Sequence, residues 1–149
     1  MNPILAFFQS NIGKKLGNGS SPLAKWLDGT LESVTEGSLS ASFTVREDMC
    51  NPGRILHGGI AVAIMDDLMG MTVASMGYEF FFTSINLSTD FLYSVPMGGQ
   101  IVCTTQIIRA GKKVVNIEAN IKDSQGRLIA KTTSNLVATS QSFKPKTNE

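Results

Sequence analysis

The chain has 149 residues, of which 42% are hydrophobic and 17% are charged, and its formal net charge is +1. This length favours a single domain over residues 1–149 with one core, and the composition excludes an intrinsically disordered chain. No nucleic-acid partner is expected, because such proteins carry a basic face and here the acidic and basic residues are interspersed.

Membrane spans, export signals and metal sites are not expected. The most apolar window, residues 60–74, contains Asp66 and Asp67, so no stretch reaches the roughly 18 uninterrupted apolar residues of a membrane helix. No basic residue precedes the short apolar run near the N-terminus, which argues against a signal peptide and favours a cytoplasmic location. Two separated cysteines, Cys50 and Cys103, and a single histidine provide no ligand cluster at zinc spacing.

The first part of the chain predicts one helix followed by two strands. Asn2 and Pro3 are typical of a helix start, and apolar residues at helical spacing continue over residues 4–16. The Gly/Ser-rich stretch 17–22 is expected to end this N-terminal helical extension, which covers residues 1–22. Period-two alternation over residues 38–45 predicts a strand with one wet face, and residues 30–35 predict a weaker strand before it.

The second part predicts one long helix and four strands. Residues 60–76 are apolar almost all round, which is typical of a buried helix, and Gly77 suits its C-terminal cap. Strands are predicted over residues 83–92, 100–109, 113–123 and 128–138, with hairpins at 110–112 and 124–126 and a loose polar tail over 141–149. The predicted fold class is α+β, a largely antiparallel sheet with one central helix.

The residues that could carry chemistry lie at the start and in the middle of this helix. A lone histidine such as His57 is usually structural, and Gly58-Gly59 can be a simple tight turn. The same glycines expose unpaired N–H groups at the positive end of a helix dipole, where they stabilise an oxygen that gains negative charge. Asp66 and Asp67 are harder to explain as structural residues, because carboxylates in an apolar helix are costly unless paired or functional.

The spacing of these groups predicts a site built by two chains. Gly58 and Asp66 are eight residues apart, which is about 12 Å along a straight helix. A catalytic base must come within about 3 Å of its target or reach it through one water, so Gly58 and Asp66 of one chain do not serve the same carbonyl. In a homodimer with antiparallel helices, Gly58 of one chain meets Asp66 of the other, which gives two sites per dimer.

With these residues the chain resembles the hotdog-fold acyl-CoA thioesterases, specifically the phenylacetate-pathway (PaaI-like) branch. The matching string is Asn-Pro-Gly-Arg-Ile-Leu-His-Gly-Gly, from Asn51 to Gly59, followed by Asp66. Segments 83–87, 91–92 and 110–112 resemble the strand after the family's helix and its later hairpin, and the similarity spans residues 30–139. The resemblance implies a curved sheet around the central helix, and hydrolysis of an acyl-CoA thioester to a free acid and CoA.

The resemblance assigns the central chemistry to two residues. Asp66 takes the position of the catalytic carboxylate, as nucleophile or as base for water, with Asp67 as the alternative. Gly58 takes the position whose N–H polarises the thioester carbonyl.

Three further residues receive supporting roles from the same resemblance. Asn51 would position the thioester or the water across the interface from the catalytic carboxylate. His57 would support the loop and the carbonyl site. Ser84 matches a position that helps to hold the water, and Thr83 would replace it if the register differs.

CoA ends in phosphates, so a basic rim is implied, and Arg109, Lys112 and Lys113 are candidates for it; their alternative role is a solvated turn. No separate cofactor is implied, because CoA is part of the substrate. The implied assembly is a homodimer, with dimers pairing into a dimer of dimers. Two other functions stay open: a non-catalytic acyl-CoA-binding or sensing domain, and a hotdog hydratase or dehydratase.

Overall fold

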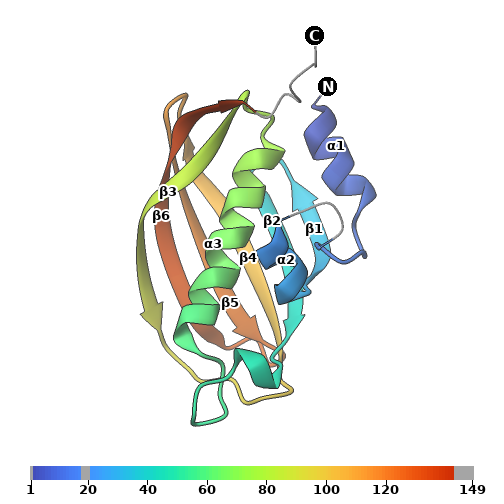
Figure 1. Cartoon of the computed structure of the whole chain (residues 1–149), viewed down its shortest axis with the longest axis vertical. Helices are drawn as coiled ribbons and strands as arrows, with labels where there is room; N and C mark the ends of the chain where they lie inside the picture. The colour runs from blue at the N-terminus through green and yellow to red at the C-terminus, as the bar shows by residue number, and fades with distance from the viewer. Residues whose placement is uncertain (1, 18–20, 143–149) are drawn as a thin grey trace.

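One antiparallel sheet wraps around a central helix in the computed structural model, which describes residues 2–17 and 21–142 (Figure 1). The order of the strands across the sheet is β1-β2-β4-β5-β6-β3. The strands are β1 (Thr30–Thr35), β2 (Ser38–Thr44), β3 (Phe80–Phe91), β4 (Gln100–Ala110), β5 (Val114–Asp123) and β6 (Leu128–Ser142). This architecture confirms the predicted α+β class and its antiparallel sheet.

The central helix α3 (Gly58–Ser75) lies against the concave face of the sheet (Figure 1). Ile64 and Leu68 are fully buried between helix and sheet. The hydroxyls of Thr72 on α3 and Thr105 on β4 form a buried 2.6 Å hydrogen bond that fixes how the helix is rotated against the sheet. By length and hydropathy alone α3 could cross a membrane, and it is the one such helix among the described residues. In this fold its apolar residues build the core instead.

The opposite face of α3 is not buried, which corrects the expectation of a helix covered all round. Residues Val62, Asp66, Gly70 and Ala74 are only half-buried. The physical reason is that the sheet covers one side of the helix, while the outer side lies open between the N-terminal helix and strand β3. An apolar sequence pattern does not distinguish these two faces.

The first helix, α1 (Pro3–Ser10), is shorter than the predicted segment 4–16. Its start is as predicted: the Asn2 side chain accepts hydrogen bonds from the N–H groups of Ile4 and Leu5. Beyond Asn11 the chain instead runs beside β1, where the N–H of Leu16 donates to the carbonyl of Gly29 at 2.9 Å. Pairing with the sheet therefore overrides the helical spacing of the apolar residues.

A second short helix, α2 (Pro22–Leu27), begins at the end of the predicted turn and covers a stretch for which the sequence predicted no element. The Ser21 hydroxyl accepts a hydrogen bond from the N–H of Ala24 and caps it. Residues 18–20 of the predicted turn lie outside the described residues. Six residues are too few for apolar periodicity to reveal a helix. A single 3₁₀ turn, η1 (Glu47–Met49), leads into the loop before α3.

Strand β3 forms one edge of the sheet, and its apolar side chains are unusually exposed. It begins three residues before the predicted start, and its register against β6 shifts between Ser84 and Asn86. The side chains of Ile85 and Phe91 keep 61% and 58% of their surface exposed. The strand therefore presents both an apolar surface and an unpaired backbone edge. At the other end of the chain β6 includes Gln141 and Ser142, and the rest of the predicted polar tail, 143–149, lies outside the described residues.

Candidate active site

Asp66 and Ser84 meet on the outer face of α3. Asp66 projects from the middle of the helix and Ser84 from β3, and the Ser84 hydroxyl donates a 2.6 Å hydrogen bond to Oδ1 of Asp66. Both side chains are half-buried. Ser84 rather than its neighbour Thr83 makes this contact. A hydroxyl at this distance orients the carboxylate and leaves its other oxygen available.

A groove of about 360 Å³ opens beside this pair. We call it the α3 groove; its lining is Phe8, Ser21, Asp66, Asp67, Gly70, Met71, Ala74, Phe81, Phe82, Thr83, Ser84 and Leu136. This volume lies within the roughly 300–1,000 Å³ of ordinary ligand pockets. An apolar groove with a few polar groups at one place suits an apolar substrate that must be held in one orientation.

Asp67 lines the same groove and accepts no hydrogen bond from any described residue. Burial, reinforced by the charge of neighbouring Asp66, raises the pKa of Asp67 from 3.8 to about 6. Adjacent helix residues point in different directions, so the two carboxyl groups differ in environment although both reach the groove.

The free energy of unfolding is expected to depend on pH through Asp67. Because the folded-state pKa lies above the unfolded value, the folded protein loses stability as the pH rises from about 4 to 6. The Asp67→Asn variant should therefore be more stable than the wild type above pH 6, by about 1 kcal/mol after allowance for solvent screening. Urea unfolding at pH 4 and pH 7.5 measures this difference. Equal gains at both pH values would contradict it.

His57 and Gly58 begin α3 and form its positive end. His57 is the N-cap, and its Nδ1 accepts a 2.8 Å hydrogen bond from the N–H of Gly59. This bond places the proton of a neutral imidazole on Nε2. The N–H of Gly58 donates to no acceptor among the described residues. It is thus an orphan donor at the end of a helix dipole, the arrangement that stabilises an oxyanion.

Gly58 opens into a second cavity of about 390 Å³, separate from the α3 groove. A methyl group built on Gly58 would lie 3.2 Å from the Phe91 ring, which closes one side of this cavity. Asp66 does not line this cavity, and Gly58 does not line the α3 groove. One protomer therefore keeps the Gly58 donor and the Asp66 carboxylate in different places.

Asn51 is engaged in shaping its own loop. Its side-chain oxygen accepts hydrogen bonds from the N–H groups of Gly53, at 3.0 Å, and Ile55, at 3.5 Å. Neither Asn51 nor His57 lines the α3 groove or the Gly58 cavity. Within the described part of one chain, the predicted set therefore divides into the Asp66–Ser84 pair and a loop that carries Asn51, His57 and Gly58.

The predicted basic rim lies on the turn between β4 and β5. Arg109, Lys112 and Lys113 are exposed, and none forms an ion pair with a described residue. The hydroxyl of Tyr78, just beyond α3, donates to the carbonyl of Gly111 at 3.0 Å and attaches this turn to the C-terminal end of the helix. These cations are available for anions, but they line neither of the two cavities.

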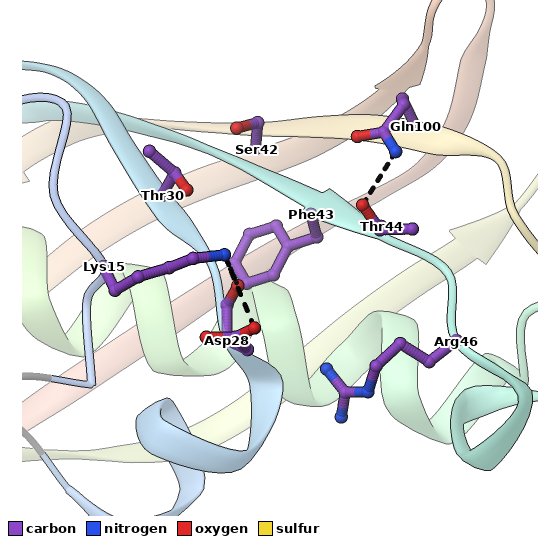
Figure 2. Close-up of a pocket in the computed structure, with 8 residues that line it drawn as sticks. All are labelled: Lys15, Asp28, Thr30, Ser42, Phe43, Thr44, Arg46 and Gln100. Carbon is purple, nitrogen blue, oxygen red and sulfur yellow. Dashed lines mark hydrogen bonds and ion pairs between the residues drawn. The ribbon is translucent and has the colours of Figure 1, made fainter.

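A small polar pocket of about 100 Å³ lies beside β2, and Asp66 does not line it (Figure 2). Its cations are already engaged: Lys15 Nζ lies 3.4 Å from a carboxylate oxygen of Asp28, and Arg46 donates to Asp48 and to two backbone carbonyls of α2. Gln100 donates to the Thr44 hydroxyl across the strands. These contacts hold α2 against the sheet and leave neither cation of the pocket without a partner.

Metal ligands and thiols add no further candidate. The described residues contain no group of three or more His, Cys, Asp or Glu side chains able to hold a metal ion. Cys103 is fully buried, and burial raises the pKa of its thiol. Cys50, half-buried, donates to the carbonyl of Arg46.

Of the residues that line the groove, the sequence named Asp66, Asp67, Thr83 and Ser84 as site candidates, but not Phe8 or Gly70. Phe8 comes from α1, which the sequence placed outside the core fold, and Gly70 sits unremarked within α3. A glycine inside a long helix was the available signal for Gly70, because glycine weakens a helix relative to alanine. No sequence signal connected Phe8 with Asp66, since only the packing of α1 on α3 brings them together.

Comparisons with known proteins agree with this architecture. Residues 53–130 match the family model described as the Thioesterase superfamily. The chain is 28% identical over 99 residues to a proposed esterase of Thermoplasma acidophilum, covering 66% of this chain and 74% of the relative. It is 24% identical over 102 residues to human acyl-coenzyme A thioesterase 13, covering 68% and 73%.

The fold is also that of solved hotdog structures. The Escherichia coli PaaI protein from the phenylacetic acid degradation operon superposes with a TM-score of 0.82 at 19% identity, over 95% of this chain and 99% of that one. A Streptococcus mutans protein bound to acetyl-CoA superposes with a TM-score of 0.72 at 18% identity, over 76% and 90%. The family match, the relatives and the fold together identify this chain as a member of the thioesterase superfamily, a thioester hydrolase with the hotdog fold.

Proposed function

We propose that the protein hydrolyses acyl-CoA thioesters at two sites shared across a homodimer. The observation that carries this proposal is the separation of the two catalytic groups within one protomer. Asp66 lines the α3 groove, whereas the orphan N–H of Gly58 opens into a different cavity. Two antiparallel α3 helices would bring the Gly58 donor of one chain to the Asp66 carboxylate of the other.

The proposed reaction needs only water and the thioester. Asp66 takes a proton from a water molecule whose oxygen attacks the carbonyl carbon, or attacks that carbon itself. The carbonyl oxygen gains negative charge and accepts a hydrogen bond from Gly58 N–H. The carbon–sulfur bond then breaks, and the CoA thiolate leaves and takes up a proton. When water is the attacking group, the free acid is released directly; when Asp66 attacks, water hydrolyses the resulting acyl–Asp66 anhydride and releases the acid. Ser84 holds the Asp66 carboxylate in place throughout.

The remaining predicted residues keep supporting roles in this proposal. Asn51 fixes the loop that precedes Gly58. His57 caps α3, the helix whose dipole makes the Gly58 N–H a stronger donor. Arg109, Lys112 and Lys113 form an exposed cluster whose charge suits the phosphates of CoA. The long reach of CoA would let these cations act although they line neither cavity.

Two surfaces support the homodimer. The outer face of α3 is half-exposed, and edge strand β3 presents exposed apolar side chains, among them Ile85 and Phe91. Apolar edge strands of this kind are normally covered by another strand or another chain. A dimer of dimers is the larger assembly that we propose. We also propose a cytoplasmic location, where the two free cysteines would stay reduced.

CoA is the first carrier to test, because one relative is named an acyl-coenzyme A thioesterase and one structural neighbour holds acetyl-CoA. The experiment follows thiol release from acetyl-, hexanoyl- and phenylacetyl-CoA. We expect turnover of at least one with kcat/KM of about 10⁴ M⁻¹ s⁻¹ or more. Tight binding of every acyl-CoA without any thiol release would favour the sensing domain instead.

A further inference from the structure

Gly70 leaves space in the α3 groove that none of the described residues fills. It lies inside an 18-residue helix, where alanine would be the more stabilising residue. A methyl group built on Gly70 would meet no atom within 4 Å. No contact with residues 2–17 or 21–142 therefore requires glycine here, and its missing side chain widens the groove.

This space continues directly from the catalytic pair. Gly70 is four residues after Asp66, so the two lie on the same face of α3, about 6 Å apart along the axis. Ala74 extends the same small-residue surface by one further turn and also lines the groove. A carbonyl carbon held at Asp66 would thus have open, apolar space in the direction of the helix C-terminus.

Helix α1 forms the opposite wall. Its Phe8 is partly buried against the core and lines the same groove as Gly70. The helix is anchored by Asn2, whose amide donates to the carbonyl of Ser75 at the end of α3 with a 2.8 Å bond. The same Asn2 side chain caps α1 through its oxygen. The Asn2 side chain thus binds α3 through its nitrogen and α1 through its oxygen, and these bonds fix the position of Phe8 relative to α3.

The third wall is aromatic. Phe81 and Phe82 of β3 line the groove, together with Met71 of α3 and Leu136 of β6. An acyl group that enters this space would exchange water for apolar side chains along most of its length, which favours carbon chains or rings over polar groups.

From this geometry we propose that the acyl group of the thioester lies along the α3 groove from Asp66 toward Ala74, and that Gly70 and Phe8 set its size. The groove then prefers apolar acyl groups bulkier than acetyl. This inference rests on the proposed function, since it assigns the substrate class of the same site. The competing occupant of the space is the α3 helix of a second copy.

The test compares variants by their selectivity. In Gly70→Ala and Gly70→Leu, kcat/KM for phenylacetyl- and hexanoyl-CoA should fall relative to acetyl-CoA, by roughly tenfold or more for leucine. Gly70→Ala should at the same time raise the melting temperature, because the new methyl has space and favours the helix. Phe8→Ala should raise the ratio of kcat/KM for phenylacetyl- and hexanoyl-CoA to kcat/KM for acetyl-CoA. The matched control is Thr35→Leu, at an exposed position of β1 on the sheet edge opposite β3, which should leave the selectivity between these substrates unchanged.

Four outcomes separate the possibilities. The assignment is supported if Gly70→Ala lowers kcat/KM for phenylacetyl- and hexanoyl-CoA relative to acetyl-CoA and raises the melting temperature. Damage to the fold would instead lower the melting temperature. An unchanged ratio overturns the assignment. A Gly70→Leu protein that sediments as a monomer and releases no thiol from any acyl-CoA also overturns it, and gives the space to the partner helix. If the wild type releases no thiol from any acyl-CoA, the proposed function fails. In that case the affinities of the same variants for phenylacetyl-CoA and acetyl-CoA, measured by calorimetry, still test the groove assignment. Equal changes in the two affinities would overturn that assignment.

Discussion

Replacing Asp66 by asparagine is expected to lower kcat for thioester hydrolysis by about 10²- to 10⁴-fold, the usual contribution of a positioned acid–base group. An amide neither takes a proton from water nor attacks a carbonyl. The variant should still fold, since the asparagine oxygen can accept the hydrogen bond that Ser84 now donates to Asp66. Steady-state thiol release, with the melting temperature measured in parallel, checks both statements.

The matched control is Asp48→Asn, which changes an exposed carboxylate of η1 in the same way. It should leave thiol release at the wild-type rate. Ser84→Ala should fall between the two, because it removes the hydrogen bond that orients the carboxylate but keeps the carboxylate. Full activity in the Asp66→Asn protein would exclude this residue as base and as nucleophile, and would move attention to Asp67.

Substituting proline for Gly58 is expected to remove the N–H that stabilises the oxyanion while leaving helix α3 intact. Gly58 is the first residue of α3, where proline is well tolerated, and His57 before it has φ −64° and ψ 133°, the extended conformation that proline requires of its predecessor. Loss of one such donor lowers kcat by about 10²- to 10³-fold. Gly58→Ala keeps the N–H while adding a methyl near the Phe91 ring, and should retain most of the activity.

The same variant tests whether the site is shared. Mixed Asp66→Asn and Gly58→Pro protomers should regain activity, because each mixed dimer holds one site with both intact groups. After random exchange of subunits this is about a quarter of the wild-type sites. If both groups acted within one chain, mixing would restore nothing beyond the sum of the two parent activities.

The sequence predicted the central helix and most strand ends to within a few residues, because their patterns directly reflect burial. Alternation marks one wet face of a strand, and a continuous apolar run marks the core helix. The N-terminal elements were harder to predict from the sequence. The end of α1 at Ser10 depends on pairing between Leu16 and Gly29, and such tertiary contacts leave no local pattern.

The sequence proposed residues for the candidate site but did not indicate the shape of the groove. The string around His57 and the position of Asp66 identified the chemistry by resemblance, and the structure adds the direct Ser84 contact. The groove was not predictable, since the sequence makes the open face of α3 look the same as its buried face. Which apolar residues face the sheet, a ligand or a partner is decided only after the helix has been placed.

The exposed edge of β3 has a consequence for how this protein should be handled. If a second chain covers this edge, association contributes to the free energy of the folded state, and mass action links folding to protein concentration. The melting temperature should then rise as the protein is concentrated, and unfolding midpoints of variants are comparable only at equal protomer concentration. A midpoint independent of concentration over a hundredfold range would mean that β3 is stable uncovered.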